Sequence, residues 1–214
     1  MEIAVQMENI YYKLYQQKCS ELEEMMFLYD MDIKSAKKLR GAIAVELLKQ
    51  LIEEYFYNNS EPYKVSAVNS YMIGSKYEYD LIIIKQTAVA FMGIVYHPED
   101  VIAIIECKVG GLYNVENDTD NIAKAVNCAI EINSNIMFGY ITMSENVPVN
   151  DKKRDGSPTF RHWDKTIECL EQKISEDIVI YAVTLDKGKK LFDKGSDTEF
   201  YKFIRHLISK NISV

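Results

Sequence analysis

The pattern of apolar and polar positions predicts a chain in which helices and strands alternate. Apolar residues three and four positions apart predict helices, and short apolar runs between turn residues predict buried strands. The predicted helices are residues 3–29 (one or two helices), 41–57, 118–133, 163–175 and 197–210. The predicted strands are residues 64–73, 78–85, 89–96, 101–108, 135–143 and 177–184, with 31–40 a basic connection or helix start and 148–160 a polar loop. This order predicts an α/β sandwich with a central mixed sheet flanked by helices.

The run Val101–Lys108 is apolar until it ends in Glu106 and Lys108. A segment that is apolar at both alternating positions is typical of a central strand covered on both faces. Because side chains alternate along a strand, Glu106 and Lys108 share one face and Cys107 lies on the other. Removing charges from water is costly unless they are paired or hold a metal. The end of this strand is therefore predicted to be a functional site.

Other acidic residues are expected near the same place. Asp80 begins a second apolar strand, so antiparallel pairing of the two strands would bring Asp80 and Glu106 to the same end of the sheet. Glu46 lies at the edge of the apolar stripe of the helix 41–57, and Glu78 is an alternative acid on the face of Asp80. A structural interpretation stays open, because acids at strand ends and on helices are commonly solvated. Cys107 is expected to be a small buried residue and not a nucleophile.

Composition limits the classes of function. A chain of 214 residues suits one domain, which we expect to comprise an N-terminal helical extension (1–34), a core (35–143) and a C-terminal helix-strand-helix addition (144–214). No apolar segment reaches the ~18 residues of a membrane span. The absence of a signal-peptide pattern and the irregular spacing of the four cysteines predict a cytoplasmic protein with reduced thiols. The net charge of −7 argues against non-specific coating of nucleic acid, but it is compatible with a nuclease.

The helix with Glu46, the strand that begins at Asp80 and the strand that ends in Glu106-Cys107-Lys108 resemble the PD-(D/E)xK nuclease superfamily. The resemblance is to small uncharacterised bacterial members with the restriction-endonuclease-like fold, and it covers residues 35–143. It implies a core made of a helix, a three-strand meander, a crossover helix and a fourth strand. One departure is that no proline precedes Asp80.

The resemblance implies a metal-dependent nuclease that hydrolyses phosphodiester bonds, in particular a DNA endonuclease of a restriction or defence type. Asp80, Glu106, Glu46 and the backbone carbonyl of Cys107 would supply the hard oxygen ligands that Mg²⁺ prefers, and Mn²⁺ could substitute. Such a cation stabilises charge on the phosphate. Lys108 would orient the attacking water or stabilise the transition state as a fixed positive charge.

The expected partner is nucleic acid, most simply DNA, and cutting both strands of a duplex would call for a homodimer. A non-catalytic member of the same fold that binds nucleic acid or protein is the alternative, and cleavage of RNA or of structured DNA also stays open. Basic residues near the predicted site are expected to contact phosphates. They are Lys38 and Arg40 before the helix with Glu46, and Lys152, Lys153, Arg154 and Arg161 in or beside the polar loop.

Overall fold

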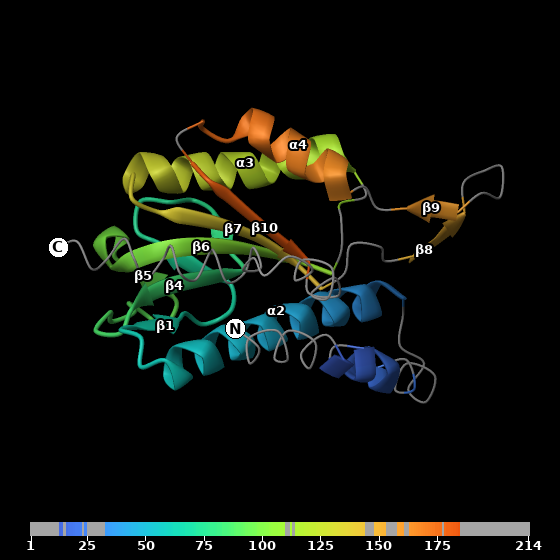
Figure 1. Ribbon diagram of the computed structural model, residues 1–214, viewed down its shortest axis with the longest axis horizontal. Helices are drawn as coiled ribbons and strands as arrows, with labels where there is room; N and C mark the ends of the chain where they lie inside the picture. Colours follow the sequence, from blue (N-terminus) through green and yellow to red (C-terminus); the bar gives the residue numbers. More distant parts are fainter. Residues whose placement is uncertain are drawn as a thin grey trace, which may run out of the picture.

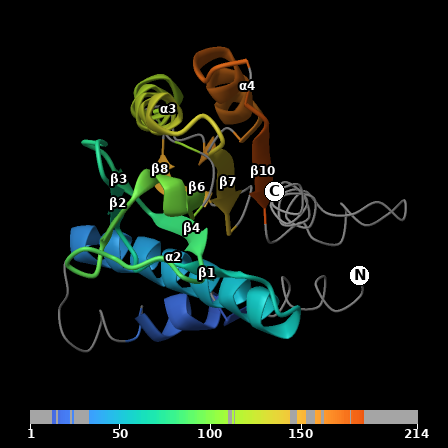
Figure 2. The ribbon, with the colours of Figure 1, turned by 90° about the vertical axis from the view of Figure 1, so that its left-hand side faces the viewer.

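The computed structural model describes residues 13–14, 16–22, 24, 33–109, 112, 114–143, 148–152, 158–160, 163–176 and 178–184. A central sheet lies between two helical layers, with α2 (Ile33–Asn58) on one face and α3 (Val115–Ile132) and α4 (Trp163–Lys173) on the other (Figure 1, Figure 2). The strands are β1 (Tyr63–Val65), β2 (Ser70–Met72), β3 (Glu78–Tyr79), β4 (Leu81–Lys85), β5 (Val95–Tyr96), β6 (Val101–Lys108), β7 (Met137–Thr142), β8 (Pro148–Lys152), β9 (Pro158–Phe160) and β10 (Ile180–Thr184), with a 3₁₀ turn η1 (Pro98–Asp100) before β6.

The central sheet is five-stranded and mixed, in the order β1-β4-β6-β7-β10. Strand β4 is antiparallel to β1 and β6, and β7 is parallel to β6 and β10. Helix α3 connects β6 to the parallel strand β7, which is the crossover that a parallel pair requires. The predicted α/β sandwich with a mixed sheet is therefore confirmed.

Alternation along the central strands creates two apolar cores, one on each face of the sheet. Ile105 and Cys107 of β6 pack in the core under α2, whereas Ile104 packs in the core that includes residues of α3 and α4. On β7, Tyr140 belongs to the α3 core and Ile141 to the α2 core. Even-numbered residues of β4, of β7 and of β6 from Ala103 onward therefore face α3, and odd-numbered residues face α2. The first two residues of β6 depart from this rule, because Val101 packs in the α3 core and Ile102 against the α2 core, where the pairing of β4 with β6 shifts register.

Helix α2 begins at Ile33, earlier than the predicted start at residue 41, so the basic stretch is mostly helical. Its apolar stripe packs on the sheet through residues such as Leu48 and Ile52, both fully buried. The helix ends where Ser60 adopts a left-handed conformation (φ 53°), and the N–H of Glu61 donates to the carbonyl of Phe56 at 2.9 Å. This is the pattern of a Schellman cap, which satisfies a carbonyl of the last turn.

Three predicted strands, at 64–73, 78–85 and 89–96, were wrong in part. The strand predicted at 78–85 is divided between β3 and β4, which belong to different sheets. The strand predicted at 64–73 is divided into β1 and β2, because the Ser66 hydroxyl accepts a hydrogen bond from the N–H of Ile82 (3.0 Å) and the chain then leaves the central sheet. With β3 and β5, β2 forms a second sheet in the order β3-β2-β5, which interrupts the expected meander. Of the strand predicted at 89–96, only β5 forms, since Met92 and Gly93 make a turn with positive φ angles.

The segment predicted as a polar loop contains the antiparallel hairpin β8–β9. The strand and helix predicted around 101–108 and 118–133 agree with β6 and α3 within a few residues. Of residues 3–29, the described ones are helical, and the helix predicted at 197–210 lies outside the described residues. Within the described ranges, no helix combines the length and apolar character that crossing a membrane requires.

Candidate active site

The pairing of β4 with β6 brings two acidic residues to one end of the sheet. Leu81 lies opposite Ile105, so Asp80, which precedes β4, lies beside Glu106 near the end of β6. The main chain holds the Asp80 carboxylate in place, because the N–H of Cys107 donates to its Oδ2 at 2.8 Å. The sequence prediction that these two acids share one end of the sheet is confirmed.

The ammonium of Lys108 lies between the two carboxylates. Its Nζ forms an ion pair with Oε1 of Glu106 and approaches Oδ2 of Asp80 at 3.7 Å. The side chains of Lys108, Glu106 and Asp80 are only 35%, 21% and 23% exposed, so water screens these charges incompletely. All three are even-numbered positions and lie on the α3 face of the sheet.

The pKa values of Glu106, Cys107 and Lys108 are all raised, for different reasons. Burial raises the pKa of the Glu106 carboxyl, the Lys108 charge opposes that rise, and the Asp80 charge adds to it. Burial alone would lower the pKa of Lys108, but Glu106 and Asp80 outweigh it and raise that pKa, so the ammonium stays charged at neutral pH. Burial raises the pKa of Cys107 well above its usual range, which keeps this residue a thiol, as expected for a small buried side chain.

The residues present suit a divalent cation, because Asp80 and Glu106 already direct oxygen atoms at one shared positive charge. Mg²⁺ is commonly held by one or two carboxylates together with waters and substrate phosphate, so two acids are sufficient. Cys107 follows Glu106 directly in the chain, and its N–H contacts Asp80, so its backbone carbonyl belongs to the same strand end. In the part of the chain that the structure describes, no group of three or more His, Cys, Asp or Glu residues is placed to hold a metal.

Glu46 is not brought into this group. It is an exposed residue of α2. Burial raises the pKa of Glu53 on the same helix, and the Glu46 charge adds to that rise. Because α2 covers the odd-numbered face of the sheet, Glu46 and the pair Asp80–Glu106 belong to different layers. The helical pattern predicted the helix correctly but carried no information about which face of the sheet it would cover.

The other candidate residues are placed as follows. Glu78 is exposed, and its carboxylate accepts a hydrogen bond from the hydroxyl of Tyr71 at 2.6 Å. Lys38 is exposed and Arg40 half-buried on α2, whose first turns lie at the end of the molecule where β6 ends (Figure 1). The hairpin β8–β9 projects from the same end, with Lys152 as the last residue of β8. Lys153, Arg154 and Arg161 lie outside the described residues.

One buried residue at this edge was missed by the sequence reasoning. Thr142 ends β7 opposite Lys108, and it is fully buried. Its hydroxyl has no hydrogen-bond partner among the described residues. The available signal was a polar residue within the otherwise apolar run from Met137 to Met143.

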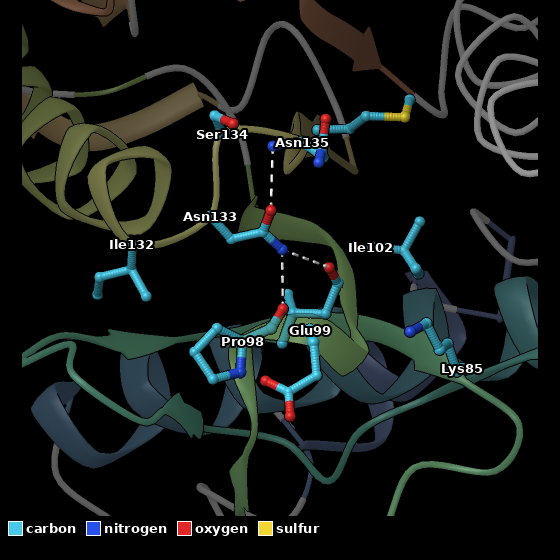
Figure 3. Close-up of a pocket in the computed structure, with 10 residues that line it drawn as sticks. Lys85, Pro98, Glu99, Ile102, Ile132, Asn133, Ser134 and Asn135 are labelled. Atoms are coloured by element: carbon cyan, nitrogen blue, oxygen red, sulfur yellow. Dashed lines mark hydrogen bonds between the residues drawn. The ribbon is translucent and has the colours of Figure 1, made fainter. Parts of the chain in front are cut away.

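A cavity of about 760 Å³ lies at the opposite end of the sheet. Asn133 braces one side of it, because its side-chain amide donates to the carbonyls of Pro98 (2.8 Å) and Val101 (3.3 Å) (Figure 3). Lys85, also on the lining, pairs with Asp100 at 3.9 Å. This cavity is therefore separate from Asp80, Glu106 and Lys108, and its Lys85–Asp100 pair provides a control for the ion pairs of the site.

Comparison with known proteins bears on the fold. No protein-family profile and no curated protein sequence matches the chain. The cAAA-bound structure of NucC from P. aeruginosa ATCC27853 aligns with a TM-score of 0.57 and 10% identity, over 96% of this chain and 89% of that one. NucC from E. coli MS115-1 aligns with a TM-score of 0.46 in its cAAA-bound form (10% identity, 81% and 94% of the two chains). The apo form of the E. coli protein also gives 0.46 (11% identity, 94% and 91%).

The likeness to the P. aeruginosa protein shows that this chain has an endonuclease-like fold. At 10% identity it is a likeness of fold alone. The sequence resemblance to the PD-(D/E)xK superfamily is thereby supported at the level of the fold.

Proposed function

We propose that this protein is a metal-dependent nuclease whose active residues are Asp80, Glu106 and Lys108. The observation that carries the proposal is the shared Lys108 ammonium, which holds two half-buried carboxylates together at the paired ends of β4 and β6. Charged groups this close are seldom kept inside a protein for stability alone, because apolar replacements are often as stable. The endonuclease-like fold makes phosphodiester hydrolysis the simplest use of such a site.

Each residue has a role that follows from its position. Asp80 and Glu106 bind Mg²⁺ or Mn²⁺, and the Cys107 N–H keeps the Asp80 carboxylate oriented. When bound, the cation supplies Lewis-acid stabilisation of charge on the scissile phosphate. Lys108, whose raised pKa keeps it protonated, provides a fixed positive charge for the attacking water or the transition state. Glu46 lies on α2, in the other layer, so it could bind the same cation only if α2 were arranged differently. Of the proposed metal ligands, Glu46 has the least support from the structure.

The first test compares site variants with matched controls in a cleavage assay. Asp80→Asn, Glu106→Gln and Lys108→Met should each lower Mg²⁺-dependent cleavage by roughly 10²–10³-fold or more, because each removes a charge at the reacting phosphate. Glu78→Gln and Lys85→Met remove an exposed acid and the lysine at the other end of the sheet, so they should retain activity. The measurement is the rate of plasmid nicking, with thermal melting as a check of folding. Full activity in both Asp80→Asn and Lys108→Met would refute the assignment.

Duplex DNA is the proposed substrate, within a restriction or defence role. Lys38, Arg40, Lys152, Lys153, Arg154 and Arg161 are the proposed phosphate contacts. The assay should therefore compare supercoiled DNA, single-stranded DNA and RNA at equal protein concentration. Because the P. aeruginosa NucC structure contains cAAA, each substrate should be tested with and without this compound. Faster cleavage of RNA than of either DNA would overturn the choice of substrate and leave the nuclease proposal in place.

A second candidate is a non-catalytic protein of the same fold that binds nucleic acid or another protein. One observation favours it: the turn between β4 and β5 exposes Val89, Phe91 and Met92. Exposed apolar side chains that cluster are often contact sites. This candidate predicts neither cleavage nor a Mn²⁺-dependent rise in melting temperature, whereas a metal site raises stability with cation concentration.

A further inference from the structure

Thr142 carries a buried polar group that nothing in the described fold satisfies. Thr142 is 0% exposed, and its hydroxyl oxygen Oγ1 has no hydrogen-bond partner among the described residues. Nearly all buried hydroxyls in proteins are hydrogen-bonded, because an unsatisfied one is destabilising. A valine of the same shape would fill the position without that penalty. The hydroxyl therefore suggests a partner that arrives in another state of the site.

Lys108 is the candidate partner, because it occupies the paired position on the neighbouring strand. Thr142 lies opposite Lys108 in the parallel pairing of β6 with β7, just as Tyr140 lies opposite Glu106. Both residues are on the α3 face, and neighbouring strands are about 4.8 Å apart. The flexible four-carbon stem of lysine allows its ammonium to move between acceptors across such a gap.

A divalent cation and the Lys108 ammonium require the same oxygen atoms. In this structure the ammonium contacts Oε1 of Glu106 and lies 3.7 Å from Oδ2 of Asp80. Binding of a cation there places two positive charges side by side, so the ammonium must move away from at least one carboxylate. Since Lys108 is only 35% exposed, the displaced ammonium also needs a hydrogen-bond acceptor inside the protein.

We propose that the Thr142 hydroxyl accepts a hydrogen bond from the displaced Lys108 ammonium, and so holds Lys108 in its working position when a divalent cation occupies Asp80 and Glu106. The inference rests on the proposed function. Thr142 is a positioning residue in this scheme, because it acts through Lys108 and touches neither cation nor phosphate. The same arrangement explains why an unsatisfied hydroxyl is kept at this strand end.

The test measures Mn²⁺ affinity by titration calorimetry on the full chain. Thr142→Val should weaken Mn²⁺ binding by about tenfold, because the displaced ammonium loses a charge-assisted hydrogen bond. Thr142→Ser keeps the hydroxyl and should retain the affinity of the wild type. In a Lys108→Met background there is no ammonium to displace, so adding Thr142→Val should leave Mn²⁺ affinity unchanged. A merely structural effect of the substitution would appear equally in both backgrounds.

Thermal melting without metal tests whether the Thr142 hydroxyl lacks a hydrogen-bond partner in the metal-free protein. Thr142→Val should melt at the same temperature as the wild type or higher, because the hydroxyl has no partner to lose in that state. A clear fall in melting temperature, equal Mn²⁺ affinity of the valine variant and the wild type, or an equal loss in the Lys108→Met background would each overturn the inference. If the wild type binds Mn²⁺ and cleaves DNA, such a result refutes only the role of Thr142. If the wild type does neither, the proposed function fails as well.

Discussion

At the scale of single residues, the site consists of one ammonium shared by two carboxylates. Because the three side chains are 21–35% exposed, partial contact with solvent limits what their attraction adds to stability. Removing one member is nevertheless destabilising, since it leaves another charge without its partner. The arrangement is therefore better explained by the need for a charged site than by the stability of the fold.

Tyr79 allows a test of burial at the same scale. It is 4% exposed, its hydroxyl lies 2.8 Å from the Ser75 hydroxyl and donates to the carbonyl of Ala125 (3.2 Å), and burial raises its pKa from 10.0 to about 12. A raised pKa stabilises the folded state below pH 10, and this contribution is lost as the pH rises from 10 to 12.

Tyr79→Phe should therefore be less stable than the wild type by about 1 kcal/mol at pH 8, through the lost hydrogen bonds. The difference should shrink and then reverse as the pH approaches 12, with a total change of about 2–3 kcal/mol. The measurement is the free energy of unfolding in urea for both proteins from pH 8 upward. A difference that does not depend on pH would show that Tyr79 ionises as it does in the unfolded chain.

At the scale of elements, the site depends on where β4 begins and where β6 and β7 end. Strand β4 begins beside the end of β6 because the two are antiparallel, and β7 ends beside β6 because those two are parallel. Helix α3 makes the parallel return possible and covers the face that carries Asp80, Glu106 and Lys108. Lys173 of α4 fixes α4 to the first turns of α3, through Asp120 (2.6 Å) and the Thr119 hydroxyl (2.8 Å).

The end of α2 offers a prediction at this scale. Ser60 adopts a left-handed conformation, which side chains other than glycine adopt at some energetic cost. Ser60→Gly should raise the free energy of unfolding by about 0.5–1 kcal/mol, since glycine is the preferred residue at this position of a Schellman cap. Ser60→Ala is the matched control and should give no gain. The measurement is the urea midpoint of each variant, and an equal midpoint for glycine and serine would contradict the proposed strain.

At the scale of the whole molecule, one chain presents one set of Asp80, Glu106 and Lys108. A single site cuts one strand of a duplex at a time, so we propose that duplex cutting uses two copies of the chain. This expectation rests on the geometry of the reaction and on the endonuclease-like fold, not on an identified interface.

Sedimentation equilibrium should then give a mass of about twice the 24.7 kDa of one chain. A plasmid assay at the same concentration should yield linear DNA with little accumulation of the nicked form. A mass equal to one chain together with accumulated nicked product would indicate a monomer that cuts each strand separately. That outcome would remove the dimer from the proposal while leaving the chemistry of the site unchanged.

The sequence by itself determined the elements whose patterns are local. The long apolar runs of β4 and β6 and the helical spacing of α2 and α3 were recognisable because burial on fixed faces requires those periods. The charged residues that interrupt the apolar runs marked Asp80, Glu106 and Lys108 as a candidate site, and the strand pairing confirmed that they meet.

Only the tertiary structure decided the features that depend on pairing between distant segments. The division of β1 from β2 follows from the hydrogen bond between Ser66 and Ile82, residues that no local pattern connects. The choice of layer separated Glu46 from the site, because an amphipathic helix packs equally well on either face of a sheet as far as its own pattern shows. The tertiary structure also decided the place of Thr142, since the register between β6 and β7, and not sequence spacing, sets it opposite Lys108.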